Sequence, residues 1–221
     1  MTVFIDVHSK DIKDIERTIA NLQPYCGTCL FIDITNSTKI KYNKGFSEWV
    51  ILLKNTFGVL ALQQKIKGNI VKFIGDAIMI FIPDDTLFTE NGSITGFYTL
   101  LEEVFATVDI LKLLHIDEVF MKCKVSIHYC EEVYDITFFK GYDDYYGKDI
   151  DITARLLSKA KENTIVISDV FYQKVIKDLK ETGKPMDTGC LKNISSRYIE
   201  DFKGVPFPIQ FHRLETPHGP E

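Results

Sequence analysis

The sequence lacks any long apolar run, and no segment approaches the roughly 18 consecutive apolar residues that a membrane-spanning helix needs. It also lacks a positively charged start followed by an apolar core, so no signal peptide is predicted. We therefore expect a cytoplasmic protein without membrane contact.

Cysteine pairs of the kind that build zinc sites are scarce. The chain has five cysteines, and Cys26 and Cys29 form a single C-x-x-C. No second pair and no histidine pair completes a zinc site. Because Cys29 runs directly into an apolar stretch, buried free thiols are favoured over redox chemistry.

Positive charge is also in deficit, since the formal net charge is −5. Broad nucleic-acid binding needs a basic face, so we expect no nucleic-acid partner. A protein of this charge binds an anionic nucleotide only where cations are concentrated at one site, which points to divalent metal plus a few Lys and Arg. The P-loop pattern G-x-x-x-x-G-K-[ST] does not occur, so a Walker-type site is excluded.

No Pro/Gly/Ser-rich linker interrupts the chain, and 221 residues are enough for one sizeable core. The order of predicted elements favours an α+β fold with a ferredoxin-like βαββαβ core. A helical stripe of Phe46, Val50, Leu53, Phe57 and Leu60 is predicted to be buried. The expected elements are strand 29–33, hairpin 70–81, helix 95–114, a second hairpin of 121–130 and 133–139 turning at Glu131 and Glu132, helix 147–161, strand 164–168, helix 169–179 and strand 206–214.

Two apolar runs each end on an aspartate beside a residue that favours a turn. Asp33 precedes the polar turn 35–38, and Asp76 follows Gly75 in the predicted hairpin. Taken singly, each is an ordinary turn aspartate. Together, their hard oxygen ligands suit Mg²⁺ or Mn²⁺, which prefers a few carboxylates plus substrate oxygens.

Four ordered motifs resemble the class III nucleotidyl cyclase catalytic domain. They read FIDITNST at 31–38, KFIGD at 72–76, YYGKDIDITAR at 145–155 and KGV at 203–205, and the resemblance runs from about 27 to 214. It implies a domain at 25–215, followed by a tail at 216–221. Before the domain, Ser9 as N-cap and isoleucines at helical spacing predict a helical extension at 1–24. The resemblance also implies an enzyme that converts a nucleoside triphosphate to a 3′,5′-cyclic nucleotide and pyrophosphate.

The resemblance implies a role for each candidate site residue. Two Mg²⁺ or Mn²⁺ ions per site would be held by Asp33, Asp76 and the Ile34 carbonyl, and the phosphates would be cradled by Asn36, Ser37 and Thr38. Arg155 would contact the α-phosphate and Lys203 the terminal phosphates. Asp151 stands where the family usually has Asn to orient the ribose, so the sugar's orientation is open. Without the other motifs, Asp151 and Arg155 would read as a surface ion pair.

Lys72 and Asp144 fall where the family reads the base. A lysine donor beside a carboxylate acceptor suits adenine or cytosine, and uracil with altered geometry, while guanine fits poorly. Five aromatic residues near Asp144 would shrink a base pocket or simply pack: Phe138, Phe139, Tyr142, Tyr145 and Tyr146.

The chain reads as a bare catalytic domain, and in this it resembles standalone pyrimidine cyclases of Pycsar antiphage defence, which make cyclic UMP or cyclic CMP. We favour that reading, with an adenylate cyclase as the alternative. A nucleotide-binding pseudo-cyclase, suggested by Asp151, stays open as well. A diguanylate cyclase is disfavoured because its Gly-Gly-Asp/Glu-Glu-Phe signature is absent.

The resemblance further implies a head-to-tail homodimer with two sites. Asp33 and Asp76 of one chain would face the base-reading and Arg residues of the other, and a two-fold axis would repeat the site.

Overall fold

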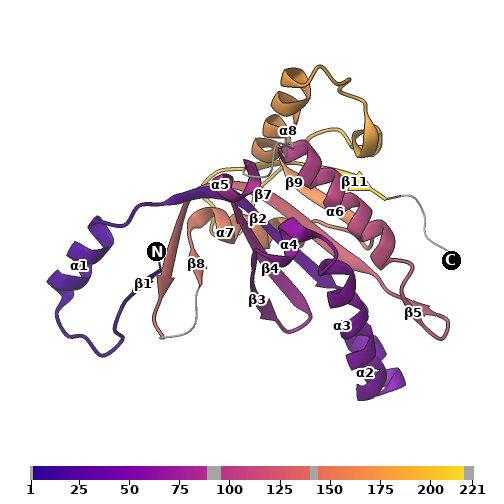
Figure 1. The fold of residues 1–221 in the computed structure, drawn as a ribbon, viewed down its shortest axis with the longest axis horizontal. Helices are drawn as coiled ribbons and strands as arrows, with labels where there is room; N and C mark the ends of the chain where they lie inside the picture. The colour runs from indigo at the N-terminus through magenta and orange to yellow at the C-terminus, as the bar shows by residue number, and fades with distance from the viewer. Residues whose placement is uncertain (1, 89–95, 140–143, 217–221) are drawn as a thin grey trace.

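The computed structural model describes residues 2–88, 96–139 and 144–216 as one α+β domain (Figure 1). The elements are β1 (Val3–Phe4), α1 (Ile12–Ala20), β2 (Tyr25–Ile34), α2 (Ser37–Lys44), α3 (Phe46–Leu60), α4 (Gln64–Lys67), β3 (Ile70–Ile74), β4 (Ala77–Pro83), α5 (Asp84–Phe88), α6 (Phe97–Leu111), β5 (His115–Ile116), β6 (Val119–Phe120), β7 (Cys123–Thr137), β8 (Tyr145–Tyr146), α7 (Lys148–Leu157), β9 (Thr164–Ser168), α8 (Asp169–Glu181), a 3₁₀ turn (Gly189–Asn193), β10 (Tyr198–Glu200) and β11 (Ile209–Glu215).

The sheet has the order β10-β11-β9-β7-β2-β4-β3. Its centre, β7-β2-β4-β3, is antiparallel throughout. With α3 between β2 and β3 and α6 between β4 and β7, this is the predicted ferredoxin-like βαββαβ arrangement, which is confirmed. β9 then joins β7 in parallel through α7, and β11 pairs with β9 in antiparallel fashion.

The strands alternate their side chains between two packed faces. Leu30 and Ile32 of β2 face the main core, which the helices α3, α6 and α8 cover (Figure 1). Cys29 and Phe31 face the opposite side, where they pack with Ile150 of α7. Asp33 follows Phe31 by two residues, so it emerges on the α7 face of the sheet.

The second predicted hairpin is wrong, because residues 123–137 form one continuous strand, β7. Glu131 and Glu132 do not turn the chain. Their backbone N–H groups donate to the Asp149 carboxylate at 2.8 and 3.4 Å, and the pairing of β7 with β2 shifts register nearby, between Tyr25 and Gly27. Glu131 and Glu132 therefore lie at an irregularity within the strand and not at a turn between two strands.

The stripe predicted to be buried on α3 is partly wrong. Phe46 and Val50 are exposed, at 64% and 42% of their maximal accessible surface, while Leu60 is fully buried. The buried residues of α3 are Leu52, Thr56, Val59 and Leu60, so the core-facing side is rotated from the predicted one. An apolar stripe can also lie on the protein surface. Helical periodicity alone does not distinguish a surface stripe from a core-facing one.

The remaining predicted elements are found with small shifts at their ends. The hairpin 70–81 turns at Gly75, whose φ of 65° suits glycine. The N-terminal helix α1 is capped by Asp11, which accepts from the N–H of Asp14, and not by Ser9. Figure 1 shows α1 standing away from the sheet, whereas β1 pairs with β7. Among helices in the described ranges, none is long and apolar enough to cross a bilayer.

Candidate active site

Asp33 and Asp76 meet at one end of the α7 face. Asp33 is the penultimate residue of β2 and pairs with Ala77 of β4, and Asp76 immediately precedes Ala77 in the tight turn. Burial raises the pKa of the Asp33 carboxyl, and the negative charge of Asp76 raises it further. Two partly buried carboxylates that repel one another would be stabilised by a cation bound between them.

The chemistry of these donors fits a hard divalent ion. Both side chains offer only oxygen ligands, as Mg²⁺ and Mn²⁺ prefer. Ile34 ends β2 with a buried side chain, so its contribution is limited to the backbone carbonyl. Within the described residues, no group of three or more His, Cys, Asp or Glu side chains is arranged to hold a metal. A metal here would therefore need further oxygens from a substrate.

The predicted phosphate turn leads into α2, and two of its side chains already have partners. The Asn36 amide donates to the Phe120 carbonyl at 2.6 Å and accepts from the Lys122 N–H at 3.1 Å. Ser37 Oγ is buried and accepts from the Trp49 indole N–H at 2.7 Å. Thr38 is exposed. The orphan N–H groups of the first turn of α2 are thus the phosphate donors that this segment offers most directly.

Asn36→Ala is expected to lower the free energy of unfolding by about 1–3 kcal/mol, because the Lys122 N–H and the Phe120 carbonyl both lose a partner. Thermal or urea unfolding measures this. Asn21→Ala is the matched control, since Asn21 is exposed and makes one hydrogen bond to the Arg17 carbonyl. An unchanged stability with a higher KM for nucleotide would instead assign the Asn36 side chain to phosphate contact.

Lys72 and Asp144, which are 72 positions apart, form an ion pair. Lys72 Nζ lies 2.7 and 2.6 Å from the two carboxylate oxygens of Asp144, which also accepts from the Tyr145 N–H. Tyr146 also lies beside this carboxylate, since burial, the Asp144 charge and a hydrogen bond to Asp144 raise the pKa of the Tyr146 hydroxyl. The two residues that the sequence predicts to read the base therefore lie in contact within one chain.

The aromatic residues near this pair divide into two groups. Tyr145 packs inward, with its ring 4.7 Å from Phe81 and 6.4 Å from Tyr25 between centroids. Tyr146 meets Phe138 edge to face at 5.7 Å, and both are partly exposed. Phe139 is exposed, and Tyr142 lies outside the described residues. Among the described residues, Tyr146 lies beside Asp144 and shares an exposed aromatic surface with Phe138.

Arg155 and the segment 203–204 are brought together from distant parts of the chain. Gly204 has a φ of 80°, and a Cβ built on it would lie 3.3 Å from Nη2 of Arg155, so the guanidinium rests against this glycine. Lys203, next to it, is exposed. Within the described residues, the side chains of Asp151 and Arg155 make no hydrogen bond or ion pair, so the surface ion pair is not formed. The guanidinium is left available for an anion.

Sequence reasoning missed the residues that fix α7. Asp149 is buried, and although burial alone would raise its pKa, hydrogen bonds from His128 and the Glu131 N–H hold the pKa below its ordinary value. A Cβ on Gly147 would lie 2.4 Å from the Glu132 carbonyl oxygen, so helix and strand approach closely there. Asp149 lies three residues before Ile152 and seven before Leu156, so the three share one face of the helix. This spacing was the available signal that Asp149 is buried.

Lys124 was also missed. It pairs with Asp33 across β2 and β7, and its positive charge partly offsets the raised pKa of the Asp33 carboxyl. Only the strand register reveals this neighbour.

The profile of the adenylate and guanylate cyclase catalytic domain matches residues 22–187. None of the curated proteins matches at a significant level.

Solved structures share the fold at low identity. The adenylyl cyclase CyaB from P. aeruginosa matches with a TM-score of 0.64 and 19% identity, covering 90% of this chain and 97% of the other. The guanylate cyclase domain of RhGC from Catenaria anguillulae in complex with GTP matches at 0.61 and 17%, covering 88% and 98%. A non-canonical dimeric guanylyl cyclase domain of RhoGC from Blastocladiella emersonii matches at 0.59 and 15%, covering 86% and 96%.

Proposed function

The chain belongs to the adenylate and guanylate cyclase catalytic domain family, and on that premise we propose that it converts a pyrimidine nucleoside triphosphate to the 3′,5′-cyclic nucleotide. The ribose 3′-oxygen attacks the α-phosphorus, the bond from that phosphorus to the bridging oxygen breaks, and the 3′-hydroxyl proton passes to solvent as pyrophosphate leaves. We assign this activity to the domain at 25–215, with 1–24 as an extension and 216–221 as a tail.

The observation that carries the proposal is the pair of Asp33 and Asp76, whose charges are concentrated on one face of the sheet. Class III cyclase domains generally depend on divalent metals. Asp33, Asp76 and the Ile34 carbonyl would hold two Mg²⁺ or Mn²⁺ ions, which when bound neutralise phosphate charge and lower the pKa of the attacking hydroxyl. The N–H groups of 36–38, with the Thr38 hydroxyl, bind the outer phosphates.

Arg155 stabilises the charge that develops on the α-phosphate, because its guanidinium is permanently charged and makes no ion pair within the described chain. Lys203 contacts the terminal phosphates from the adjacent loop. Asp151 is exposed and accepts from a ribose hydroxyl, with Arg155 four residues on offsetting its charge. The contact of Arg155 with Gly204 supports placing the two cations at one triphosphate.

Dimerisation completes the site in this proposal, because the metal aspartates and Arg155 come from different copies. Phe73 and Ile74 support it, since they are 53% and 51% exposed directly before Gly75 and Asp76. The exposed Phe46 and Val50 of α3 add apolar surface, and the rings of Phe57 and Phe73 join α3 to this hairpin at 4.9 Å. Large exposed apolar side chains beside a site are typical of an interface.

The base preference rests on the Lys72–Asp144 pair and its aromatic neighbours. An ammonium beside a carboxylate can donate and accept along one base edge, as cytosine, uracil or adenine requires. Tyr146 and Phe138 occupy space beside this pair, which favours the smaller pyrimidine ring. Cyclic UMP or cyclic CMP would then act as an antiphage signal, as in the standalone pyrimidine cyclases that the chain resembles.

The test is incubation of purified protein with ATP, GTP, CTP and UTP separately, each with Mn²⁺, followed by mass spectrometry of the products. We expect a cyclic pyrimidine nucleotide and pyrophosphate. Cyclic AMP alone would replace the pyrimidine assignment by an adenylate cyclase. No product from any of the four, in a sample shown to be dimeric, would favour the nucleotide-binding pseudo-cyclase that the carboxylate of Asp151 suggests.

A further inference from the structure

The helix α7 carries two of the residues assigned to the substrate, Asp151 and Arg155. Its apolar side chains hold it against the sheet. Ile150 belongs to a cluster with residues of β2 and β4, and Ile152 and Leu156 belong to one with residues of β9 and β11. Because apolar burial has no direction, it sets the place of a helix along a strand less sharply than hydrogen bonds do.

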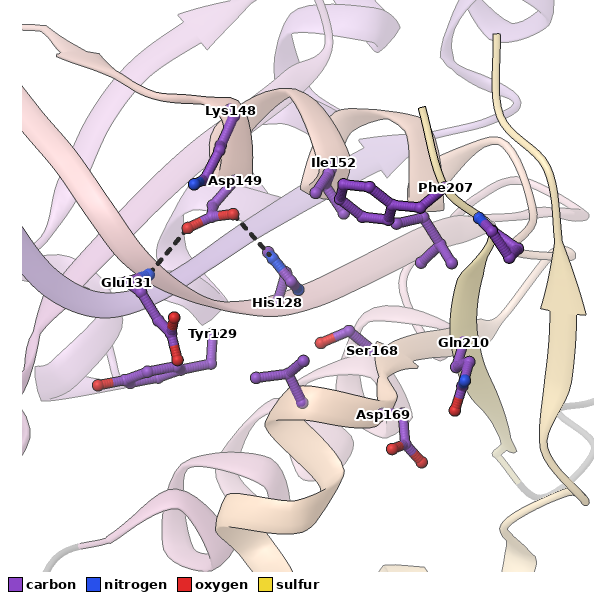
Figure 2. A pocket seen from close by; sticks show the side chains of 13 residues that line it. His128, Tyr129, Glu131, Lys148, Asp149, Ile152, Ser168, Asp169, Phe207 and Gln210 are labelled. Carbon is purple, nitrogen blue, oxygen red and sulfur yellow. Dashed lines mark hydrogen bonds and ion pairs between the residues drawn. The ribbon is translucent and has the colours of Figure 1, made fainter. Parts of the chain in front are cut away.

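Asp149 anchors the first turn of α7 to β7. Its carboxylate accepts from the backbone N–H groups of Glu131 and Glu132 at 2.8 and 3.4 Å, and Nε2 of His128 lies 3.6 Å away. Figure 2 shows this carboxylate directed at β7, with dashed lines joining it to Glu131 and His128. Hydrogen bonds to an ionised group are stronger than neutral ones, and here they tie the helix to one place on the strand.

Ser126 anchors the middle of α7 to the same strand. Its neighbours Val125 and Ile127 face the main core, so Ser126 points to the α7 face of the sheet. Its side chain is fully buried, and its Oγ donates to the Thr153 carbonyl at 2.8 Å. A carbonyl inside a helix already accepts an N–H from the next turn. The bond from Ser126 is therefore additional, and it joins the helix to the strand.

Two anchors at separate points of β7 restrict both sliding of α7 along the strand and rotation about its own axis. Arg155 follows Thr153 by two residues, so its backbone lies next to the second anchor. Its guanidinium then rests against Gly204, where an added Cβ would lie 3.3 Å from Nη2. Placement of this kind matters for catalysis, because an error of about 1 Å can cost about a hundredfold in rate.

We propose that Ser126 and Asp149 are positioning residues, which hold α7 so that Arg155 meets the α-phosphate in the transition state. The role rests on the proposed function, which assigns Arg155 to that phosphate. Neither residue touches the substrate, and both act through Arg155. Since the metal ions, Lys203 and the N–H groups at the start of α2 still bind the nucleotide, loss of an anchor lowers kcat and leaves KM nearly unchanged.

Ser126→Ala tests this role with the least disturbance, because it removes one hydroxyl and adds no bulk. We expect kcat to fall about tenfold or more while KM stays within about twofold. The two constants are measured from the rate of cyclic product formation over a range of nucleotide concentrations. A wild-type kcat in Ser126→Ala would overturn the role of Ser126.

Thr153→Val is the matched control on the same helix. The Thr153 hydroxyl is also buried and donates to a backbone carbonyl, that of Asp149, at 2.7 Å. This bond lies within α7 and does not reach β7, so we expect the variant to keep the wild-type kcat. Equal losses of kcat in Ser126→Ala and Thr153→Val would show a general effect of lost hydrogen bonds and would overturn the positioning role.

A double-mutant cycle shows whether the anchors act through Arg155. If they do, Ser126→Ala should lower kcat no further once Arg155→Ala is present, because the group that they position is gone. Asp149→Asn keeps an oxygen for the Glu131 N–H but loses the charge, and it should give the same pattern of lower kcat in the Arg155 protein only. Equal fold losses in both backgrounds would contradict the proposal.

Amide hydrogen exchange tests the anchors without turnover. Ser126→Ala should speed exchange in α7, Lys148–Leu157, and leave α8, Asp169–Glu181, unchanged as the internal reference. Unchanged exchange in α7 would show that Ser126 does not anchor the helix. Faster exchange with a wild-type kcat would overturn the positioning role and leave the cyclase assignment intact. Absence of cyclic product from the wild-type protein would overturn the proposed function itself, so the two failures are distinguishable.

Discussion

Replacing Asp33 by asparagine is expected to abolish cyclic nucleotide formation while making the metal-free protein more stable. The loss should be about a thousandfold or more, because a metal site contributes several kcal/mol of charge stabilisation and each 1.4 kcal/mol or so is tenfold in rate. The gain in stability follows from removing one carboxylate of a repelling, partly buried pair. Product analysis and thermal unfolding in EDTA measure the two effects.

The stability effect has a defined pH dependence. Burial and the Asp76 charge raise the folded-state pKa of Asp33 above its ordinary value of 3.8. Ionisation of Asp33 is thus disfavoured in the fold, so the wild-type protein loses stability relative to Asp33→Asn as pH rises from 3.8 through the folded-state pKa. At lower pH the two should unfold at the same temperature. Added Mn²⁺ should raise the midpoint of the wild-type protein and have little effect on the variant.

Asp187→Asn is the matched control for this experiment. Asp187 is exposed, so its loss should leave both activity and metal-free stability unchanged. Full activity in Asp33→Asn would remove Asp33 from the metal site, and a lower metal-free stability would show that the carboxylate is held by attraction rather than repulsion.

Mixing two inactive variants should restore activity if the site is shared between copies. Asp33→Asn loses the metal half of a site, and Arg155→Ala loses the α-phosphate half. In a head-to-tail dimer, each mixed pair has one site with both defects and one intact site. Random exchange of equal amounts therefore yields about a quarter of the wild-type activity, since half of the dimers are mixed and each has one working site.

The control mixture is Asp33→Asn with Asp76→Asn, whose lesions lie in the same half-site and cannot complement. Cyclic product in the first mixture and none in the second is the expected pattern. No recovery in the first mixture, with subunit exchange demonstrated by labelled copies, would place the whole site within one chain and overturn the shared arrangement.

Local chemistry explains what could be read from the sequence. The turn at Gly75 and Asp76 was predicted because a glycine beside an aspartate between apolar runs leaves few alternatives to a hairpin. Strand 164–168 was predicted with its bounds as observed, since a short run rich in β-branched residues ends at the helix-capping Ser168. The resemblance gave Lys72 and Asp144 a shared role in reading the base, but their ion pair was not predicted, because no local signal joins positions so far apart.

The errors share one cause, which is that a local pattern does not state what packs against it. Glu131 and Glu132 have the composition of a turn, yet the Asp149 carboxylate satisfies their N–H groups and the strand continues. Phe46 and Val50 have the spacing of a core stripe, yet no layer covers them within the described chain. The role of Asn36 as a phosphate ligand stays a prediction, and the pattern likewise did not state that its amide bonds to the Phe120 carbonyl and the Lys122 N–H.

The sequence by itself determined the α+β class, the order of the motifs and the residue types of the candidate site, because turn chemistry, strand and helix periodicity and motif spacing act over short stretches. Only the tertiary structure decided that Asp33 lies beside Asp76 and Lys124, that Arg155 rests on Gly204, and that Nδ1 of His128 is buried without a hydrogen-bond partner. These contacts depend on strand register and on how α7 lies across the sheet. Register and packing are set by the whole core at once, so no single segment encodes them.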